Sequence, residues 1–217
     1  EIDAERFAGA WWYRTEFEVE EPPASGARIA FDGINYSAEV WLNGSKVAGR
    51  DEVYGAFRTF DLDAGAHLVA GTNALAVLVF PPEPGDPTIG FVDWNPEAPD
   101  KHMGLWRPVK LRLTGGVALD DVFVRSDVDL ETLDRASLTV SGTLRNHSDN
   151  EVRAAVRGTI SGGIEVELTE VIAPRAEATI AFSPEDYPDL VIENPRLWWP
   201  NGMGEPELYD LSLDVRV

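Results

Sequence analysis

The feature that most constrains the fold is a two-residue alternation of side chains near the start of the chain. From Trp11 to Val19, the odd positions hold aromatic, apolar or β-branched residues, and most of the even positions, such as Arg14 and Glu16, are charged. This period is typical of a strand with one buried face. Pro22-Pro23 ends the segment, and no long stretch of the chain repeats with the period of a helix. The pattern therefore predicts an all-β protein.

A series of short strands follows in the first half of the chain. Asn43-Gly44 supplies the positive-φ residues of a tight hairpin turn, which joins residues 38–42 to a strand around Val47. Strands of this kind predict a mainly antiparallel sandwich. The other strands predicted in this half are residues 28–31, 55–60, 75–80 and 106–113.

A pair of glycines, Gly115-Gly116, interrupts this series, and a second series begins at Val117. It contains about seven short strands separated by turns, a spacing typical of an immunoglobulin-like sandwich. The 217 residues also exceed the commonest domain size, which favours two domains. We predict a first β-sandwich domain over residues 1–116 and an immunoglobulin-like one over residues 117–217.

The amino-acid composition limits which classes of molecule the protein can bind. The formal net charge of −20 repels nucleic acid and anionic membranes, so we expect neither as a partner. No apolar run reaches the roughly 18 residues of a membrane helix, and the chain has no cysteine for a disulfide framework. His67, His102 and His147 lack the spacing of metal ligands. We predict no metal and no cofactor.

A long proline-rich segment, residues 81–103, breaks the pattern of short turns. Connections longer than about 12 to 15 residues are uncommon in compact domains and are usually functional or disordered. Sugar sites combine an aromatic face for the ring with carboxylates or amides for vicinal hydroxyls, and Asp93-Trp94-Asn95 offers both. In the alternative, structural interpretation, Trp94 closes the end of the sandwich and Asp93 caps a turn. The residue types alone favour neither.

Segments along nearly the whole chain resemble the N-terminal β-domains of family 2 glycoside hydrolases, and they occur in that family's order. Those before residue 116 are similar to its sugar-binding jelly roll, and those after residue 190 are similar to the end of its first immunoglobulin-like domain. The segments are Phe31-Asp32-Gly33-Ile34-Asn35, Val40-Trp41-Leu42-Asn43-Gly44, Gly71-Thr72-Asn73-Ala74-Leu75, Gly104-Leu105-Trp106-Arg107-Pro108-Val109, residues 194–202 and Pro206-Glu207-Leu208-Tyr209.

The resemblance implies a jelly roll followed by an immunoglobulin-like sandwich, which form the non-catalytic front of a retaining glycosidase. The two catalytic carboxylates of such an enzyme lie on a further (β/α)8 barrel, so we assign no catalytic residue in this chain. That barrel and a β-linked oligosaccharide of glucosamine or mannose type are the implied partners. Family members carry strands ahead of the one at Trp11, so we interpret the jelly roll as N-terminally truncated. Only the resemblance favours a secreted protein.

The resemblance also suggests which residues contact the sugar. In the β-mannosidases of the family, a Trp-Asp-Trp-Gly segment projects toward the terminal sugar, and Val92-Asp93-Trp94-Asn95 stands in the corresponding place. Asp93 and Trp94 match this segment, whereas Val92 and Asn95 depart from it. Residues 99–106 look closer to the exo-β-D-glucosaminidases, which we favour as the subgroup. The substrate-binding residues that we predict are Asp93, Trp94, Asn95, Asp100 and Lys101.

Other interpretations stay open at this point. The parent of the chain is a β-mannosidase or a β-galactosidase in the first alternative. In a second, the chain is a stand-alone carbohydrate-binding module that grips glycans without cleaving them, and in a third it is a purely structural pair of adhesion domains. Trp198-Trp199 is interpreted as a packing surface at a domain end, since a tryptophan pair buries a large apolar area.

Overall fold

The structure is a computed structural model that describes residues 3–23, 26–90, 94, 96 and 98–217. The chain folds into two compact units, Glu1–Thr114 and Gly115–Val217. Both units are built from antiparallel strands, and the helices among the described residues are short 3-10 turns at Ala4–Phe7 (η1), Gly65–His67 (η2) and Pro188–Leu190 (η3). Of the helices described, none has the length and apolar character needed to cross a membrane.

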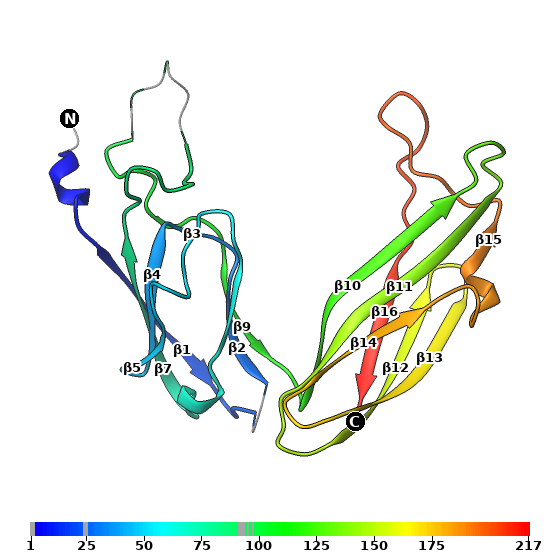
Figure 1. The fold of residues 1–217 in the computed structure, drawn as a ribbon, viewed down its shortest axis with the longest axis horizontal. Helices are drawn as coiled ribbons and strands as arrows, with labels where there is room; N and C mark the ends of the chain where they lie inside the picture. Colours follow the sequence, from blue (N-terminus) through cyan, green and yellow to red (C-terminus); the bar gives the residue numbers. More distant parts are fainter. Residues whose placement is uncertain (1–2, 24–25, 91–93, 95, 97) are drawn as a thin grey trace. The chain divides into compact units, whose positions relative to one another are not determined.

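Unit 1 is the predicted jelly roll, a sandwich of two sheets (Figure 1). One sheet has the strand order β1-β7-β4-β5 and the other has the order β6-β2-β9, while β3 and β8 form a separate pair. The strands are β1 (Trp11–Val19), β2 (Ala27–Phe31), β3 (Ile34–Asn35), β4 (Ser37–Leu42), β5 (Ser45–Ala48), β6 (Phe60–Asp63), β7 (Gly71–Phe80), β8 (Gly104–Leu105) and β9 (Val109–Leu113).

The core of unit 1 lies between its two sheets. Val40 and Val77 from the first sheet meet Phe31 from the second, and all three side chains are buried. The predicted hairpin is confirmed, because Asn43 and Gly44 turn between β4 and β5 with φ values of 51° and 81°. These are the positive values that a two-residue hairpin turn requires.

Three sequence predictions for unit 1 are wrong in part. The strand expected at residues 106–113 begins only at Val109. Residues 55–59 form no strand, and the strand there begins only at Phe60. The reason is that Gly55 has a φ of 105° and its carbonyl accepts a turn hydrogen bond from the amide of Arg58. The strand from Trp11 to Val19 exists, but the face expected to be buried is open at Trp11 and Tyr13, each 38% exposed. The strand is the edge strand of its sheet, and only its later residues on that face, Phe17 and Val19, pack against the core.

Unit 2 is the predicted immunoglobulin-like sandwich. Strand β11 pairs with β10, β14 and β15 in one sheet, and the other sheet has the order β13-β12-β16. Phe182, Leu144 and Val156 lie fully buried between the sheets. The strands are β10 (Val117–Val128), β11 (Arg135–Asn146), β12 (Val152–Ile160), β13 (Ile164–Ile172), β14 (Glu177–Phe182), β15 (Val191–Glu193) and β16 (Leu211–Arg216).

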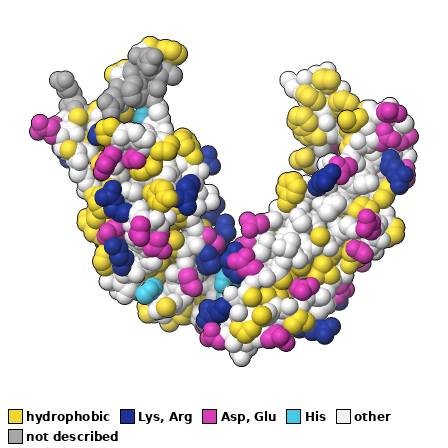
Figure 2. All heavy atoms as spheres, in the orientation of Figure 1, with side chains coloured by type: hydrophobic (Ala, Val, Ile, Leu, Met, Phe, Trp, Pro, Cys, Tyr) yellow, Lys and Arg dark blue, Asp and Glu magenta, His cyan; other side chains and the backbone are white. Residues whose placement is uncertain are grey.

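One end of unit 2 exposes large apolar side chains. Leu130, Trp198 and Leu208 are 84%, 58% and 73% exposed, and Met203 is 67% exposed. Figure 2 shows apolar side chains gathered over the loop that precedes β16. Beneath it, a shallow hollow of about 480 Å³ is lined mainly by apolar residues from β10, β11 and this loop. We call Leu130, Trp198, Met203 and Leu208 the apolar end of unit 2.

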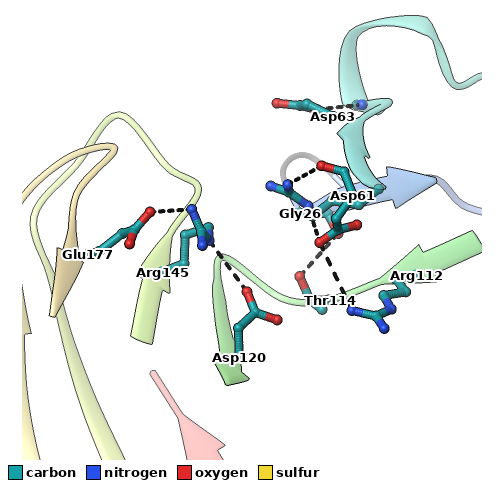
Figure 3. Close-up of polar contacts among 10 residues, drawn as sticks. Gly26, Asp61, Asp63, Arg112, Thr114, Asp120, Arg145 and Glu177 are labelled. Atoms are coloured by element: carbon teal, nitrogen blue, oxygen red, sulfur yellow. Dashed lines mark hydrogen bonds and ion pairs between the residues drawn. The ribbon is translucent and has the colours of Figure 1, made fainter. Parts of the chain in front are cut away.

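Each unit also carries ion pairs across neighbouring strands (Figure 3). In unit 1, Asp61 on β6 accepts a hydrogen bond at 2.8 Å from Arg28 on β2 and lies within 4.0 Å of a second arginine, Arg112. In unit 2, Arg145 on β11 lies between Asp120 and Glu177 from the two flanking strands. These pairs are at least partly exposed, so they add less to stability than the cores do.

We expect the core of unit 2 to distinguish two phenylalanines of the same unit. Phe182→Ala removes a side chain with no exposed surface and should lower the free energy of unfolding by about 3–5 kcal/mol. Phe123→Ala removes one that is 64% exposed and should change it by less than about 0.5 kcal/mol. Guanidinium unfolding of the intact chain, with hydrogen exchange followed in peptides from residues 117–217, measures both. Equal losses would contradict this core.

Candidate functional site

The segment that sequence analysis selected, residues 81–103, joins β7 to β8 and extends from the end of unit 1 at which β3 lies (Figure 1). Asp93 and Asn95, two of the predicted contacts, lie outside the described residues. Trp94 is described and is 83% exposed. Its ring therefore does not close the end of the sandwich, and this excludes the structural interpretation for Trp94.

Asp100 and Lys101, the other predicted contacts, lie close to the exit of the segment. An Asp100 carboxylate oxygen accepts a hydrogen bond at 3.0 Å from the amide of His102, so this carboxylate caps a local turn. Lys101 and His102 both adopt positive φ, at 53° and 54°. Next to them Met103 is buried in the core of unit 1 and anchors the exit. Asp100 thus shapes the segment, and Lys101 remains half-exposed.

A buried asparagine on β3 holds the segment from beneath. Asn35 has no exposed surface, and its amide nitrogen donates to the backbone carbonyls of His102 at 2.8 Å and Lys101 at 3.3 Å. Its amide oxygen accepts from the hydroxyl of Thr88 at 2.6 Å. The amide therefore links two parts of the segment that are 13 residues apart in sequence, Thr88 and Lys101.

The next residue, Tyr36, faces the entry half of the segment. Its backbone amide donates to the carbonyl of Phe80, the last residue of β7, at 3.2 Å. Burial, together with the charge of Asp86 and a hydrogen bond to it, raises the pKa of the Tyr36 hydroxyl above its ordinary value. A tyrosine hydroxyl is protonated at neutral pH, so this phenol can act as a hydrogen-bond donor. Asp86 also accepts from the amide of Glu83 at 2.8 Å, which fixes the turn there.

These contacts form the rim of an open depression of about 410 Å³ at this end of unit 1. The size is within the usual range for small-ligand sites, although the depression is open to solvent. Its rim combines carboxylates, a hydroxyl and a lysine, the groups that bind sugar hydroxyls and amines. The polar residues that line it are Glu83, Asp86, Thr88, Lys101 and His102.

Sequence reasoning did not select Asn35, Thr88 or Asp86 as functional residues. Asn35 was part of a motif recognised for its resemblance, but nothing in the motif shows that its side chain is buried. A usable signal was present, because a polar residue within a short apolar strand must find hydrogen-bond partners. In the described part of the chain, no three His, Cys, Asp or Glu side chains are grouped so that they could hold a metal ion.

A second, apolar groove of about 570 Å³ opens in unit 1 between the edge strands β1 and β9. Phe17 on β1, Val77 on β7 and Leu111 on β9 line it. Near its upper end, the hydroxyl of Tyr13 on β1 approaches Gly104 so closely that a β-carbon on this glycine would lie 2.6 Å from it. The glycine therefore serves the packing of β1 against the exit of the segment.

Each of the two units matches a known protein-family model. Residues 3–84 match the family model described as the galactose-binding domain-like domain of glycosyl hydrolase 2, and residues 117–217 match the model for glycosyl hydrolases family 2. Together the two matches cover most of the chain, in the order that the two units have in the structure. The chain belongs to glycosyl hydrolase family 2.

Individual relatives agree with this assignment. An exo-beta-D-glucosaminidase of Amycolatopsis orientalis is 37% identical over all 217 residues, and a mannosylglycoprotein endo-beta-mannosidase of Lilium longiflorum is 31% identical over 99% of the chain. The crystal structure of the Amycolatopsis orientalis exo-chitosanase superposes on 99% of the chain with a TM-score of 0.89 and 36% identity. The chain spans only 20% to 25% of the length of these proteins.

Because Tyr13 approaches Gly104 so closely, we expect one methyl group added at Gly104 to lower the stability of the chain strongly. Gly104→Ala meets both the Tyr13 hydroxyl and an unfavourable φ of 143°, so it should destabilise the chain by more than the roughly 1–3 kcal/mol of backbone strain alone. Gly44→Ala is the matched control, since its φ is 81° and it has open space around it. Urea unfolding midpoints measure both.

Adding Tyr13→Phe to Gly104→Ala should recover part of the loss, because the hydroxyl is the atom nearest to the new methyl group. The strain from φ should remain. If the double variant is no more stable than Gly104→Ala, the predicted contact is incorrect.

Proposed function

We propose that the chain acts as the front part of a retaining exo-β-D-glucosaminidase, where it helps to frame the sugar pocket of a separate (β/α)8 barrel. In this proposal the substrate is a β-linked oligosaccharide of glucosamine type, and the chain by itself carries no hydrolase activity. The observation that carries it is the long, anchored segment 81–103 at one end of the jelly roll, with an exposed tryptophan and a polar rim.

Charge and side-chain chemistry favour an amino sugar. Glu83 and Asp86 lie on the rim of the depression, and the whole chain has a net charge of −20. A protonated amine is attracted by such a field, whereas a phosphorylated or uronic-acid sugar is repelled. Trp94 stands free on the same segment and offers a flat apolar face to a pyranose ring. Asp93 would then accept hydrogen bonds from hydroxyl or amine groups.

The apolar end of unit 2 supports the part of the proposal that concerns the barrel. Isolated apolar residues are normal on protein surfaces, but contiguous exposed patches mark interaction sites. Leu130, Trp198 and Leu208 line one apolar hollow and are exposed, which agrees with the packing interpretation of Trp198-Trp199. The partner we propose for this surface is the barrel of the same enzyme.

A second candidate function is the stand-alone carbohydrate-binding module. The depression at the end of unit 1 favours it, because a module needs a ligand site complete within its own chain. A β-mannosidase parent is the runner-up within the family, since mannosidases of that family also resemble the chain, at 28% to 31% identity.

The enzyme proposal predicts a kinetic effect at Asp93. This chain replaces the matching N-terminal part of the Amycolatopsis orientalis exo-beta-D-glucosaminidase, and hydrolysis of PNP-β-D-glucosamine is measured. Asp93→Ala in the chimera should raise KM or lower kcat by about an order of magnitude or more, because a carboxylate that binds the sugar is lost. Asp51→Ala, at an exposed aspartate elsewhere in unit 1, should leave both constants unchanged. Unchanged kinetics for Asp93→Ala would remove the segment from the site.

Calorimetry on the 217-residue chain distinguishes the two candidate functions. A module should bind chito-oligosaccharide with a millimolar or lower Kd, whereas one wall of a shared pocket should bind barely at all. Trp94→Ala is the control in both cases, since it removes the exposed ring and should abolish any binding that the segment provides. If the chain still binds chito-oligosaccharide tightly after Trp94→Ala, the sugar-binding role of residues 81–103 is wrong under both candidate functions.

A further inference from the structure

We propose that Asn35 is the positioning residue of the sugar-binding segment, the side chain that ties Thr88 in its first half to Lys101 and His102 at its exit. This role rests on the function proposed above for the segment, and Asn35 itself contacts no substrate in it. Its side chain has no exposed surface and lies on the core side of the segment.

Asn35 and its neighbour make contacts at three places along the segment. At the entry, the amide of Tyr36 donates to the carbonyl of Phe80 at 3.2 Å. In the middle, the Thr88 hydroxyl donates to the Asn35 side chain. At the exit, the Asn35 side chain donates to Lys101 and His102, and its backbone pairs with Gly104 in the β3–β8 ladder. Two adjacent residues therefore connect the beginning, middle and end of a 23-residue connection.

No other residue type can make the same set of bonds. The two hydrogens of the Asn35 amide nitrogen go to two carbonyls, and the oxygen accepts from a hydroxyl. Aspartate would keep the acceptor but would set a negative charge against two carbonyl oxygens. Alanine would leave the two carbonyls and the hydroxyl without their partner in a part-buried site, and this is a costly way to lose a hydrogen bond.

Among the described residues of the segment, Pro82 and Met103 are buried, and Lys101 and His102 sit at positive φ, a conformation that such residues rarely keep without outside support. A chain so constrained should open locally, without unfolding of the jelly roll, once the Asn35 amide is removed. Trp94 would then no longer be held in one place relative to the rim.

A bland interpretation is that Asn35 merely stabilises the jelly roll. Asn73 provides the matched control for it, because it is also fully buried and donates to two backbone carbonyls, those of Val69 and Gly71, at 2.8 and 2.9 Å. It lies near the start of β7, at the opposite end of that strand from the segment. Its loss should therefore weaken the same unit without releasing residues 81–103.

Tryptic cleavage of the native chain after Lys101 tests the proposal. Lys101 is the only lysine or arginine between residues 81 and 103, and its carbonyl belongs to the bond that trypsin cuts. If the segment must open locally before trypsin can cut, Asn35→Ala should raise the rate of cleavage after Lys101 by roughly tenfold. Thr88→Val should raise it by roughly threefold. Asn73→Ala should leave this rate near that of the unsubstituted chain, at a concentration of trypsin and a temperature at which all variants remain folded by circular dichroism.

Asn35→Asp separates the two sides of the amide, since it keeps the acceptor for Thr88 and loses the donor to the exit. Cleavage after Lys101 should be as fast as in Asn35→Ala. Equal cleavage rates in Asn35→Ala and Asn73→Ala, or cleavage no faster than in the unsubstituted chain, would overturn the proposal. If Asn35→Ala does not fold, the cleavage rates of Thr88→Val and Asn35→Asp are compared with that of Asn73→Ala instead.

The chimera with the Amycolatopsis orientalis enzyme separates this inference from the function on which it rests. Asn35→Ala should raise KM for PNP-β-D-glucosamine by a larger factor than it lowers kcat, because a wall of the pocket loses its position while the barrel is untouched. Faster tryptic cleavage with unchanged kinetics would support the positioning role and overturn the sugar-binding role of the segment. Unchanged cleavage together with altered kinetics would overturn the positioning role alone.

Discussion

A buried side-chain amide must find hydrogen-bond partners. In unit 1 the amide of Asn35 finds them in the segment 81–103, so this requirement connects the β-sandwich to the candidate site. The side chain of Asn35 meets the requirement by bonding to Thr88, Lys101 and His102, described residues of the segment that belong to no strand. The β-sandwich is thereby tied to two separate parts of this long connection. An exposed tryptophan and a polar rim can then be carried on a connection far longer than the usual turn.

Local patterns were enough to predict the fold wherever one side chain or backbone angle decides the structure. Asn43-Gly44 specified its hairpin because only such residues tolerate two positive φ values, and the alternation in residues 11–19 correctly indicated a strand. The same alternation gave the wrong exposure for Tyr13, since period two shows that a strand has two faces and not whether a second sheet covers either. The strand expected at residues 55–60 failed because Gly55 turns the chain.

The sequence was enough to propose where a site lies, but not to predict the contacts that hold it. Prolines and aromatic residues marked residues 81–103, residue chemistry singled out Asp93-Trp94-Asn95, and Asp93 and Trp94 also matched the family segment. The contacts of Asn35 span 53 residues to Thr88 and 67 to His102, and no local pattern encodes pairings at such separations. Asp100 shows the reverse case, since a carboxylate selected for sugar binding caps a turn, as aspartate often does in loops.

The groove between β1 and β9 has a consequence for how the chain behaves in solution. Both strands present unpaired backbone edges beside an apolar lining, which is the arrangement through which sheets join to one another. Such edges favour strand exchange between molecules as the concentration rises. The high negative charge opposes this association, and added salt screens the charge while leaving the apolar lining intact. Higher ionic strength therefore weakens the charge repulsion that opposes edge-to-edge pairing at this face.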